Sequence, residues 1–205
     1  MRTSRQWYDI LVACQVRPIV AAQWSEVFAD TVRPGTFSDG DDDLRAFLGQ
    51  ILHESAGLTH LSENLNYTAE RLTVVWPWRF PTLADARPYA NNPEALANRV
   101  YGGRMGNTQP GDGWRYRGRS PLQITGRQNY AFVGDLMGQD LIGLPGLLEQ
   151  PRYALEACIA WWENKIPDEV LGDPEKTTRI VNGGVIGLAD RVHLTELAGA
   201  ALCFG

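Results

Sequence analysis

Apolar residues recur at helical spacing along most of the chain, which predicts a mainly helical fold. The segments with this pattern are residues 5–14, 18–32, 43–56, 68–75, 93–101, 127–138, 151–165, 174–182 and 187–202. In the best defined of them, one continuous stripe is formed by Leu44, Phe47, Leu48, Ile51, Leu52 and Ser55. The aspartates at 41–43 suit the positive end of this helix's dipole, and Gly57 offers a stop.

Residues 102–126 break the helical pattern. They are rich in glycine and arginine, and aromatic and charged residues alternate from Trp114 to Arg117, which predicts extended chain or a short hairpin. Upstream, a proline-rich stretch over residues 77–93 marks a loop-dominated connection between two helical halves. We therefore expect one mainly α domain over residues 1–205, with a small extended element near its middle.

Composition narrows the class of protein. The 205 residues are 44% apolar and include 20 aromatic side chains, enough to bury a core without disulfides or a structural metal. A net charge of −5 argues against nucleic-acid binding through bulk electrostatics. No apolar run approaches the ~18 residues of a spanning helix, so membrane insertion is not expected. The apolar stretch near the start is too short for a signal peptide, which predicts synthesis in the cytoplasm.

Positive charge is concentrated in one segment. Residues 99–127 hold six arginines and one aspartate, a net +5 in a chain whose total is −5. Arginine forks bind carboxylates in two-point contacts. The segment is therefore expected either to line a site for an acidic ligand or to pair with the acidic remainder of the chain.

The sequence argues against a catalytic cysteine and against a zinc site. The cysteines Cys14, Cys158 and Cys203 form no CxxC pair and are predicted to be small buried hydrophobes. A His-Glu dipeptide at His53 begins like a zinc-peptidase motif, but the next histidine is His60. Two histidines seven residues apart lie two helical turns from each other, too far to share a metal. No metal is expected.

Two glutamates fit a pair of catalytic carboxyls. Glu54 borders the apolar stripe, so we expect partial desolvation to favour its protonated form. Glu63 follows the Gly57 break among polar residues and should stay ionised. One protonated and one ionised carboxyl are the two roles that glycoside hydrolysis requires. A chain with 24 acidic residues contains many such pairs, so spacing alone leaves other readings open.

Four ordered blocks of sequence resemble glycoside hydrolase family 19 in its short bacterial and phage-lysin form. They read HESAGLTHLSENLNYTAE over residues 53–70, YGGRMGN over 101–107, GDGWRYRGRSPLQITGRQNY over 111–130 and TRIVNGGVIGLADR over 178–191. The resemblance implies a lysozyme-like, mainly helical fold with two lobes around a substrate cleft. It also implies hydrolysis of β-1,4 bonds in chitin or peptidoglycan glycans, with inversion.

The resemblance assigns roles to individual residues. Glu54 falls at the general-acid position, Glu63 at the general-base position, and Thr125 at the hydroxyl residue that holds the attacking water. The expected substrate-binding residues are Gln123, Asn182, Arg191, Tyr67 and Arg117. The resemblance implies no metal and no organic cofactor, and a monomer is expected.

The substrate is narrowed by departures from the family's plant chitinases. Their long insertion between the Asn-Gly-Gly and Ala-Asp-Arg elements is reduced here to residues 185–188. This favours an endolysin that cleaves peptidoglycan, has no separate wall-binding module and reaches the wall through a holin-type lesion or dedicated secretion. The alternatives are a secreted interbacterial hydrolase toxin, a chitinase acting on chitin oligomers, and a catalytically dead glycan-binding module.

Overall fold

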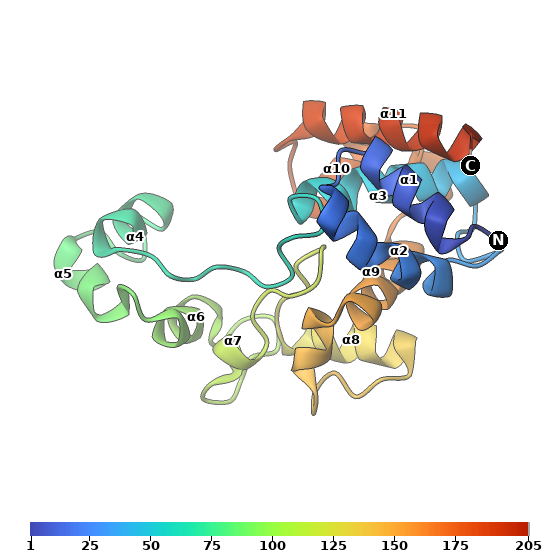
Figure 1. Cartoon of the computed structure of the whole chain (residues 1–205). Helices are drawn as coiled ribbons and strands as arrows, with labels where there is room; N and C mark the ends of the chain where they lie inside the picture. The colour runs from blue at the N-terminus through green and yellow to red at the C-terminus, as the bar shows by residue number, and fades with distance from the viewer. Residues whose placement is uncertain (205) are drawn as a thin grey trace.

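The computed structural model describes residues 1–204 and is mainly helical (Figure 1). Its α-helices are α1 (Ser4–Ala13), α2 (Pro18–Thr31), α3 (Gly40–Glu54), α4 (Ala69–Val75), α5 (Leu83–Ala86), α6 (Pro93–Tyr101), α7 (Asp112–Arg115), α8 (Arg127–Met137), α9 (Pro151–Lys165), α10 (Pro174–Asn182) and α11 (Leu188–Phe204). Short 3₁₀ helices are η1 (Arg87–Tyr89), η2 (Pro145–Glu149) and η3 (Asp168–Val170). Among the described residues, no helix is long and apolar enough to cross a membrane.

The nine helices expected from periodicity are confirmed, with ends that shift by at most a few residues. The extended element is much smaller than expected. Residues 112–115 form α7 rather than extended chain, and β pairing within residues 1–204 is limited to isolated bridges from Arg119 to Ser62 and to Ile124. The alternation of aromatic and charged residues predicted extended chain wrongly, because α7 is a single turn and is too short to show a helical period.

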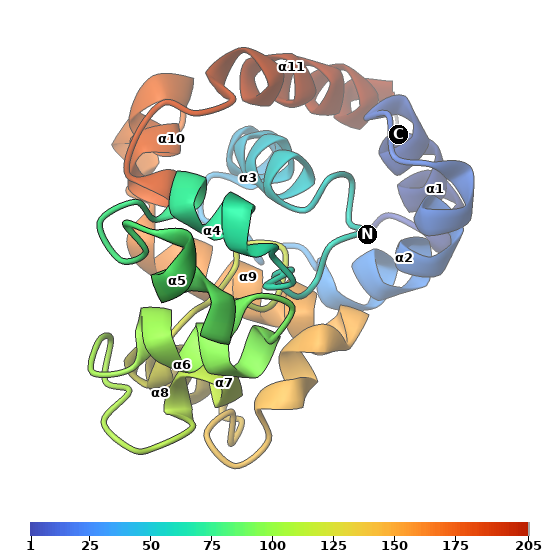
Figure 2. The ribbon, with the colours of Figure 1, turned by 90° about the vertical axis from the view of Figure 1, so that its left-hand side faces the viewer.

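Helix α3 is the centre of the larger lobe. Figure 2 shows it in the middle, with α1, α2, α10 and α11 around it. Phe47, Leu48 and Ile51 of its apolar stripe are fully buried. The helix ends where the Ser55 hydroxyl accepts a bond from the Leu58 amide and Gly57 takes a positive φ of 65°. This stop places Glu54 at the last position of a rigid central helix.

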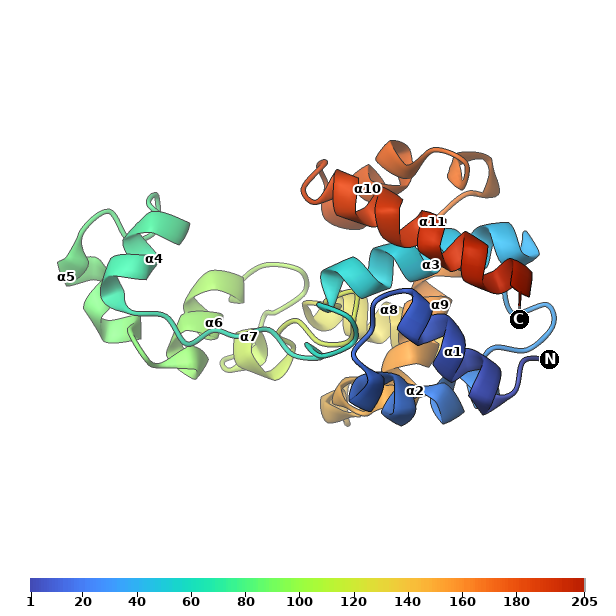
Figure 3. The same cartoon turned by 45° about the horizontal axis from the view of Figure 1, so that its top comes forward.

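The smaller lobe, formed by α4 to α6, projects from the larger one (Figures 1 and 3). It has its own apolar core, made by Leu65, Ala69, Leu72, Phe80, Ala86, Leu96, Ala97 and Val100. Helix α7 packs against α6. The expected two-lobed, lysozyme-like arrangement is therefore confirmed.

An acidic cluster, in which Asp43 is buried and Glu163 is exposed, joins the start of α3 to α9. Asp43 is 1% exposed and accepts a bond from the Trp162 indole. The Ser38 hydroxyl lies 3.1 Å from Asp43 Oδ2, and the Ser38 amide donates to Glu163 Oε2 at 3.1 Å. Burial and then the hydrogen bond and charge of Asp43 raise the pKa of Glu163 to about 7.

This cluster predicts a pH-dependent loss of stability. Because the folded-state pKa of Glu163 lies above its unfolded value, the folded protein binds more protons between about pH 4.5 and 7. The free energy of unfolding should therefore fall as pH rises through that window, and Glu163→Gln should remove this part of the fall. Melting temperatures at pH 5 and pH 8 test it, with Glu169→Gln on exposed η3 as the control. Equal decreases in wild type and Glu163→Gln would contradict the prediction.

Candidate active site

Glu54 lies at the C-terminal end of α3 and faces α11. Its Oε1 accepts a hydrogen bond from the Arg191 guanidinium. The Arg191 side chain is 1% exposed and that of Glu54 is 23% exposed. Partial burial of Glu54 was expected from the stripe, but its main partner is a buried cation 137 positions away in sequence. The apolar border is therefore only part of its surroundings.

Arg191 belongs to a buried polar network. Its Nη1 donates to Gln50 Oε1, and the Gln50 amide donates to Thr178 Oγ1 at 3.1 Å. Its Nε donates to the Ile186 carbonyl at 3.1 Å. One guanidinium thus ties α3 and the α10–α11 connection together and fixes the carboxyl of Glu54.

Asn182 shapes the connection between α10 and α11. Its Nδ2 donates to the Ile186 carbonyl at 3.2 Å, and its Oδ1 accepts from the Gly184 amide at 2.8 Å. Beside this turn, His53 Nδ1 lies 2.6 Å from Asp190 Oδ2. Both polar ends of the Asn182 side chain are thus engaged within its own loop, so its expected role in sugar binding stays a prediction.

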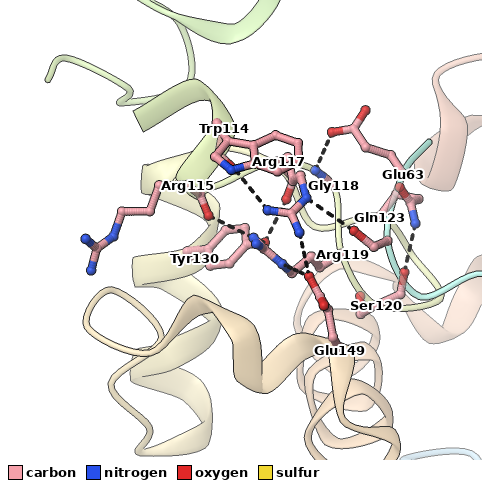
Figure 4. Close-up of polar contacts among 11 residues, drawn as sticks. Glu63, Trp114, Arg115, Arg117, Gly118, Arg119, Ser120, Gln123, Tyr130 and Glu149 are labelled. Carbon is pink, nitrogen blue, oxygen red and sulfur yellow. Dashed lines mark hydrogen bonds and ion pairs between the residues drawn. The ribbon is translucent and has the colours of Figure 1, made fainter. Parts of the chain in front are cut away.

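Glu63 is held by two hydrogen-bond donors. Its Oε1 accepts from the Gly118 amide at 2.6 Å (Figure 4), and its Oε2 accepts from the Tyr101 hydroxyl at 2.7 Å. The Glu63 amide in turn donates to the Gly118 carbonyl at 3.0 Å. Each carboxylate oxygen can accept more than one hydrogen bond, so Glu63 can still accept a hydrogen bond from a water molecule.

Gln123 and Thr125 meet Glu63 around Gly118. A Cβ placed on Gly118 would lie 2.6 Å from Gln123 Oε1, 3.1 Å from Thr125 Oγ1 and 3.3 Å from Glu63 Oε1. The three side chains therefore converge on one point, which only a glycine leaves open. The Thr125 hydroxyl donates to the Gln123 carbonyl at 2.8 Å. The structure thus brings together Glu63, Thr125 and Gln123, and the roles expected for them stay predictions.

Arg117 and Arg119 share one carboxylate beside this point (Figure 4). Arg117 Nη2 lies 2.8 Å from Glu149 Oε1, and its guanidinium stacks 4.0 Å from the centre of the Trp114 ring. Arg119 is 5% exposed and also donates to the Tyr130 hydroxyl at 2.9 Å. Arg117 is thus held inside the protein, so the structure does not present it as a free substrate-binding group.

Two other arginines of the segment 99–127 also bind groups within the protein. Arg127 pairs with Asp112 at 3.3 Å, and Arg115 donates to the Ile142 carbonyl at 3.0 Å. The expectation that the whole segment would serve an acidic ligand is wrong for these arginines. Arg127 pairs with an aspartate of the same segment and Arg115 with backbone carbonyls, whereas Arg117 and Arg119 pair with Glu149 outside the segment, as the alternative expectation had it.

Tyr67 lies in the smaller lobe, where its ring packs edge-on against Trp76 at 5.4 Å. It is only partly exposed, and its expected contact with substrate stays a prediction. Three residues of the site were missed by sequence reasoning: Tyr101, Gln50 and Glu149. The block pattern contained Tyr101, but nothing in its spacing pointed to a hydrogen bond with Glu63.

The three cysteines differ in burial. Cys14 and Cys158 are buried, and burial raises the pKa of each thiol to about 12, as expected for inert core residues. Cys203 is exposed, so the expectation that all three cysteines are buried is wrong for this one. Across residues 1–204, no three His, Cys, Asp or Glu side chains gather as metal ligands would.

Comparison with known proteins gives close and distant relatives. The chain is 38% identical over 152 residues to a glycosyl hydrolase family 19 domain-containing protein of Haemophilus influenzae, covering 72% of this chain and 74% of the relative. It is 32% identical over 135 residues to an acidic endochitinase of Petunia hybrida, covering 63% of this chain but 40% of that protein. No family model matches the chain.

A solved structure shares the fold. Chitinase C from Streptomyces griseus superimposes with a TM-score of 0.59 at 16% sequence identity, covering 98% of this chain and 92% of the other. At this identity the likeness concerns the arrangement of helices. It agrees with the two-lobed, mainly helical architecture described above.

Proposed function

Because the chain belongs to glycoside hydrolase family 19 and is a chitinase-like glycoside hydrolase, we propose that it cleaves the β-1,4 bonds of peptidoglycan glycan strands by an inverting mechanism. The observation that carries the proposal is the contrast between two glutamates. Glu54 is fixed by a buried arginine at the end of α3. Glu63 is fixed by an amide and a phenol where the two lobes join.

The mechanism assigns one proton transfer to each glutamate. Glu54 donates a proton to the glycosidic oxygen as the bond to the leaving sugar breaks. Glu63 takes a proton from a water molecule as that water attacks the anomeric carbon from the opposite face. The new reducing end then has the inverted configuration.

Neighbouring side chains support these roles. Thr125 lies with Glu63 around Gly118, where its hydroxyl oxygen can accept a bond from the same water. The Gln123 side chain shares this point and supplies a polar contact for a sugar hydroxyl or acetamido group. Arg191 keeps Glu54 in place, so its part in substrate binding is through the carboxyl that it positions.

Peptidoglycan is proposed over chitin because the connection between α10 and α11 is short. Only residues 183–187 separate the two helices. The match to the bacterial relative also covers most of both chains, whereas the match to the petunia endochitinase covers less than half of that protein. A chitinase is the second candidate, since several relatives carry endochitinase names.

Turnover on peptidoglycan and on a chitin oligomer tests which of the two is the substrate. Purified peptidoglycan and a soluble N-acetylglucosamine hexamer are incubated with matched enzyme, and mass spectrometry identifies the new reducing ends. We expect faster release of reducing ends from peptidoglycan. A clear preference for the hexamer would support the chitinase and reject the endolysin, while leaving the glutamate pair intact.

A further inference from the structure

Tyr101 connects Glu63 to the smaller lobe. It is the last residue of α6, and its hydroxyl donates to Glu63 Oε2 at 2.7 Å. The other oxygen of Glu63 is bound by the Gly118 amide, which lies on the segment that leads into the larger lobe. Each carboxylate oxygen of Glu63 is thus held by one donor, one from the smaller lobe and one from the segment that leads into the larger lobe.

The position of Tyr101 is itself fixed. Its carbonyl accepts a bond from the Asn107 side-chain amide at 3.1 Å and one from the Arg104 backbone amide at 3.2 Å. Its ring packs against the apolar core of the smaller lobe. These contacts fix the backbone and the ring of Tyr101, and so they fix the position of its hydroxyl.

We propose that Tyr101 is a positioning residue for Glu63, which orients the carboxylate toward the attacking water and makes its alignment depend on the placement of the smaller lobe. The inference rests on the proposed role of Glu63 as general base. Hydrogen bonds to a charged group are among the stronger ones in proteins, and loss of alignment in a general base is costly.

Burial and the charge of Glu63 keep the Tyr101 hydroxyl protonated, so that it remains a hydrogen-bond donor. Burial, followed by the charge of Glu63, raises the pKa of Tyr101 well above its ordinary value, so the hydroxyl keeps its proton. The other titratable or charged groups that act on Tyr101 are Tyr67 and Arg104. Arg117 is the nearby cation that senses the charge of Glu63, and it is already paired with Glu149.

Tyr101→Phe tests the proposal, since it removes the hydroxyl and keeps the ring. We expect kcat to fall roughly 10- to 100-fold with little change in KM, because the lost bond orients the base and does not touch substrate. The acidic limb of the kcat/KM profile should move to higher pH, because the carboxylate loses a donor that favours its charged form. Tyr89→Phe, in the same lobe against Phe80, is the matched control and should leave both unchanged.

A titration without substrate separates this proposal from the proposed function. The ¹³C carboxyl signal of Glu63 should titrate at a higher pH in Tyr101→Phe than in wild type, whether or not the enzyme turns over peptidoglycan. If Tyr101→Phe folds poorly, 3-fluorotyrosine at position 101 keeps the contact with a stronger donor and should shift the titration to lower pH. Unchanged titration in these variants, or unchanged kcat and pH profile in Tyr101→Phe, would overturn the positioning role.

Discussion

Replacing Glu54 with glutamine is expected to lower kcat by about 100- to 10,000-fold, the usual contribution of a general acid. The amide keeps the shape of the carboxyl but has no acidic proton to give to the leaving sugar. Glutamine can still accept a hydrogen bond from Arg191 through its carbonyl oxygen, so the fold should be retained, but the melting temperature should fall because the buried Arg191 loses its counterion. Release of reducing ends from peptidoglycan, measured together with the melting temperature, checks both parts.

Glu63→Gln should also lose most of its activity, because an amide cannot take a proton from water. Both glutamates act in one displacement, so the double variant should be scarcely slower than the worse single variant. Thr125→Ala should lose less, since a water molecule can partly replace the hydroxyl. Full activity in Glu63→Gln would show that another group is the base.

Replacing Arg191 with methionine is expected to cost about 3–5 kcal/mol of unfolding free energy, the range for breaking a buried ion pair at one partner. The change leaves Glu54 without its cation and Gln50 Oε1 without its donor, and it removes one of the two donors to the Ile186 carbonyl. Activity should fall as well, because the general acid loses the group that positions it. Chemical denaturation of the purified variant measures the stability part.

A surface arginine on the neighbouring helix provides the control. Arg179 pairs with Glu175 one turn away on α10, with 56% and 53% of the two side chains exposed. Because exposed pairs contribute little, Arg179→Met should cost less than about 1 kcal/mol. Arg191→Lys is informative too, since an ammonium cannot reproduce the guanidinium's three directed bonds and should remain well below wild type in stability. If Arg191→Met were as stable as Arg179→Met, the buried network around Arg191 would not stabilise the fold as expected.

The long helices could be predicted because each carries its signal locally. Helix α3 has an acidic first turn, an apolar stripe and a stop at Ser55–Gly57, all within one stretch of sequence. The short α7 carries no such signal, since four residues cannot show a period of 3.6. Its aromatic and charged residues serve packing and ion pairs instead.

The site was only partly predictable because its contacts join distant parts of the chain. The sequence blocks indicated Glu54, Glu63, Gln123, Thr125 and Arg191, but no local pattern reports that Arg191 is buried and binds Glu54, 137 positions away. The same applies to Glu149, which accepts hydrogen bonds from Arg119 and Arg117, 30 and 32 positions before it. Which basic side chains are free to bind substrate therefore depends on pairing between residues that are far apart in the sequence.

The anomeric configuration of the first product tests the central claim most directly. A soluble peptidoglycan fragment is hydrolysed in an NMR tube, and the anomeric proton of the new reducing end is recorded before mutarotation. A water that attacks opposite the leaving group, activated by Glu63 while Glu54 protonates the leaving oxygen, predicts the α-anomer from a β-1,4 bond. Initial appearance of the β-anomer would mean retention and would contradict the assignment of Glu63 as a general base.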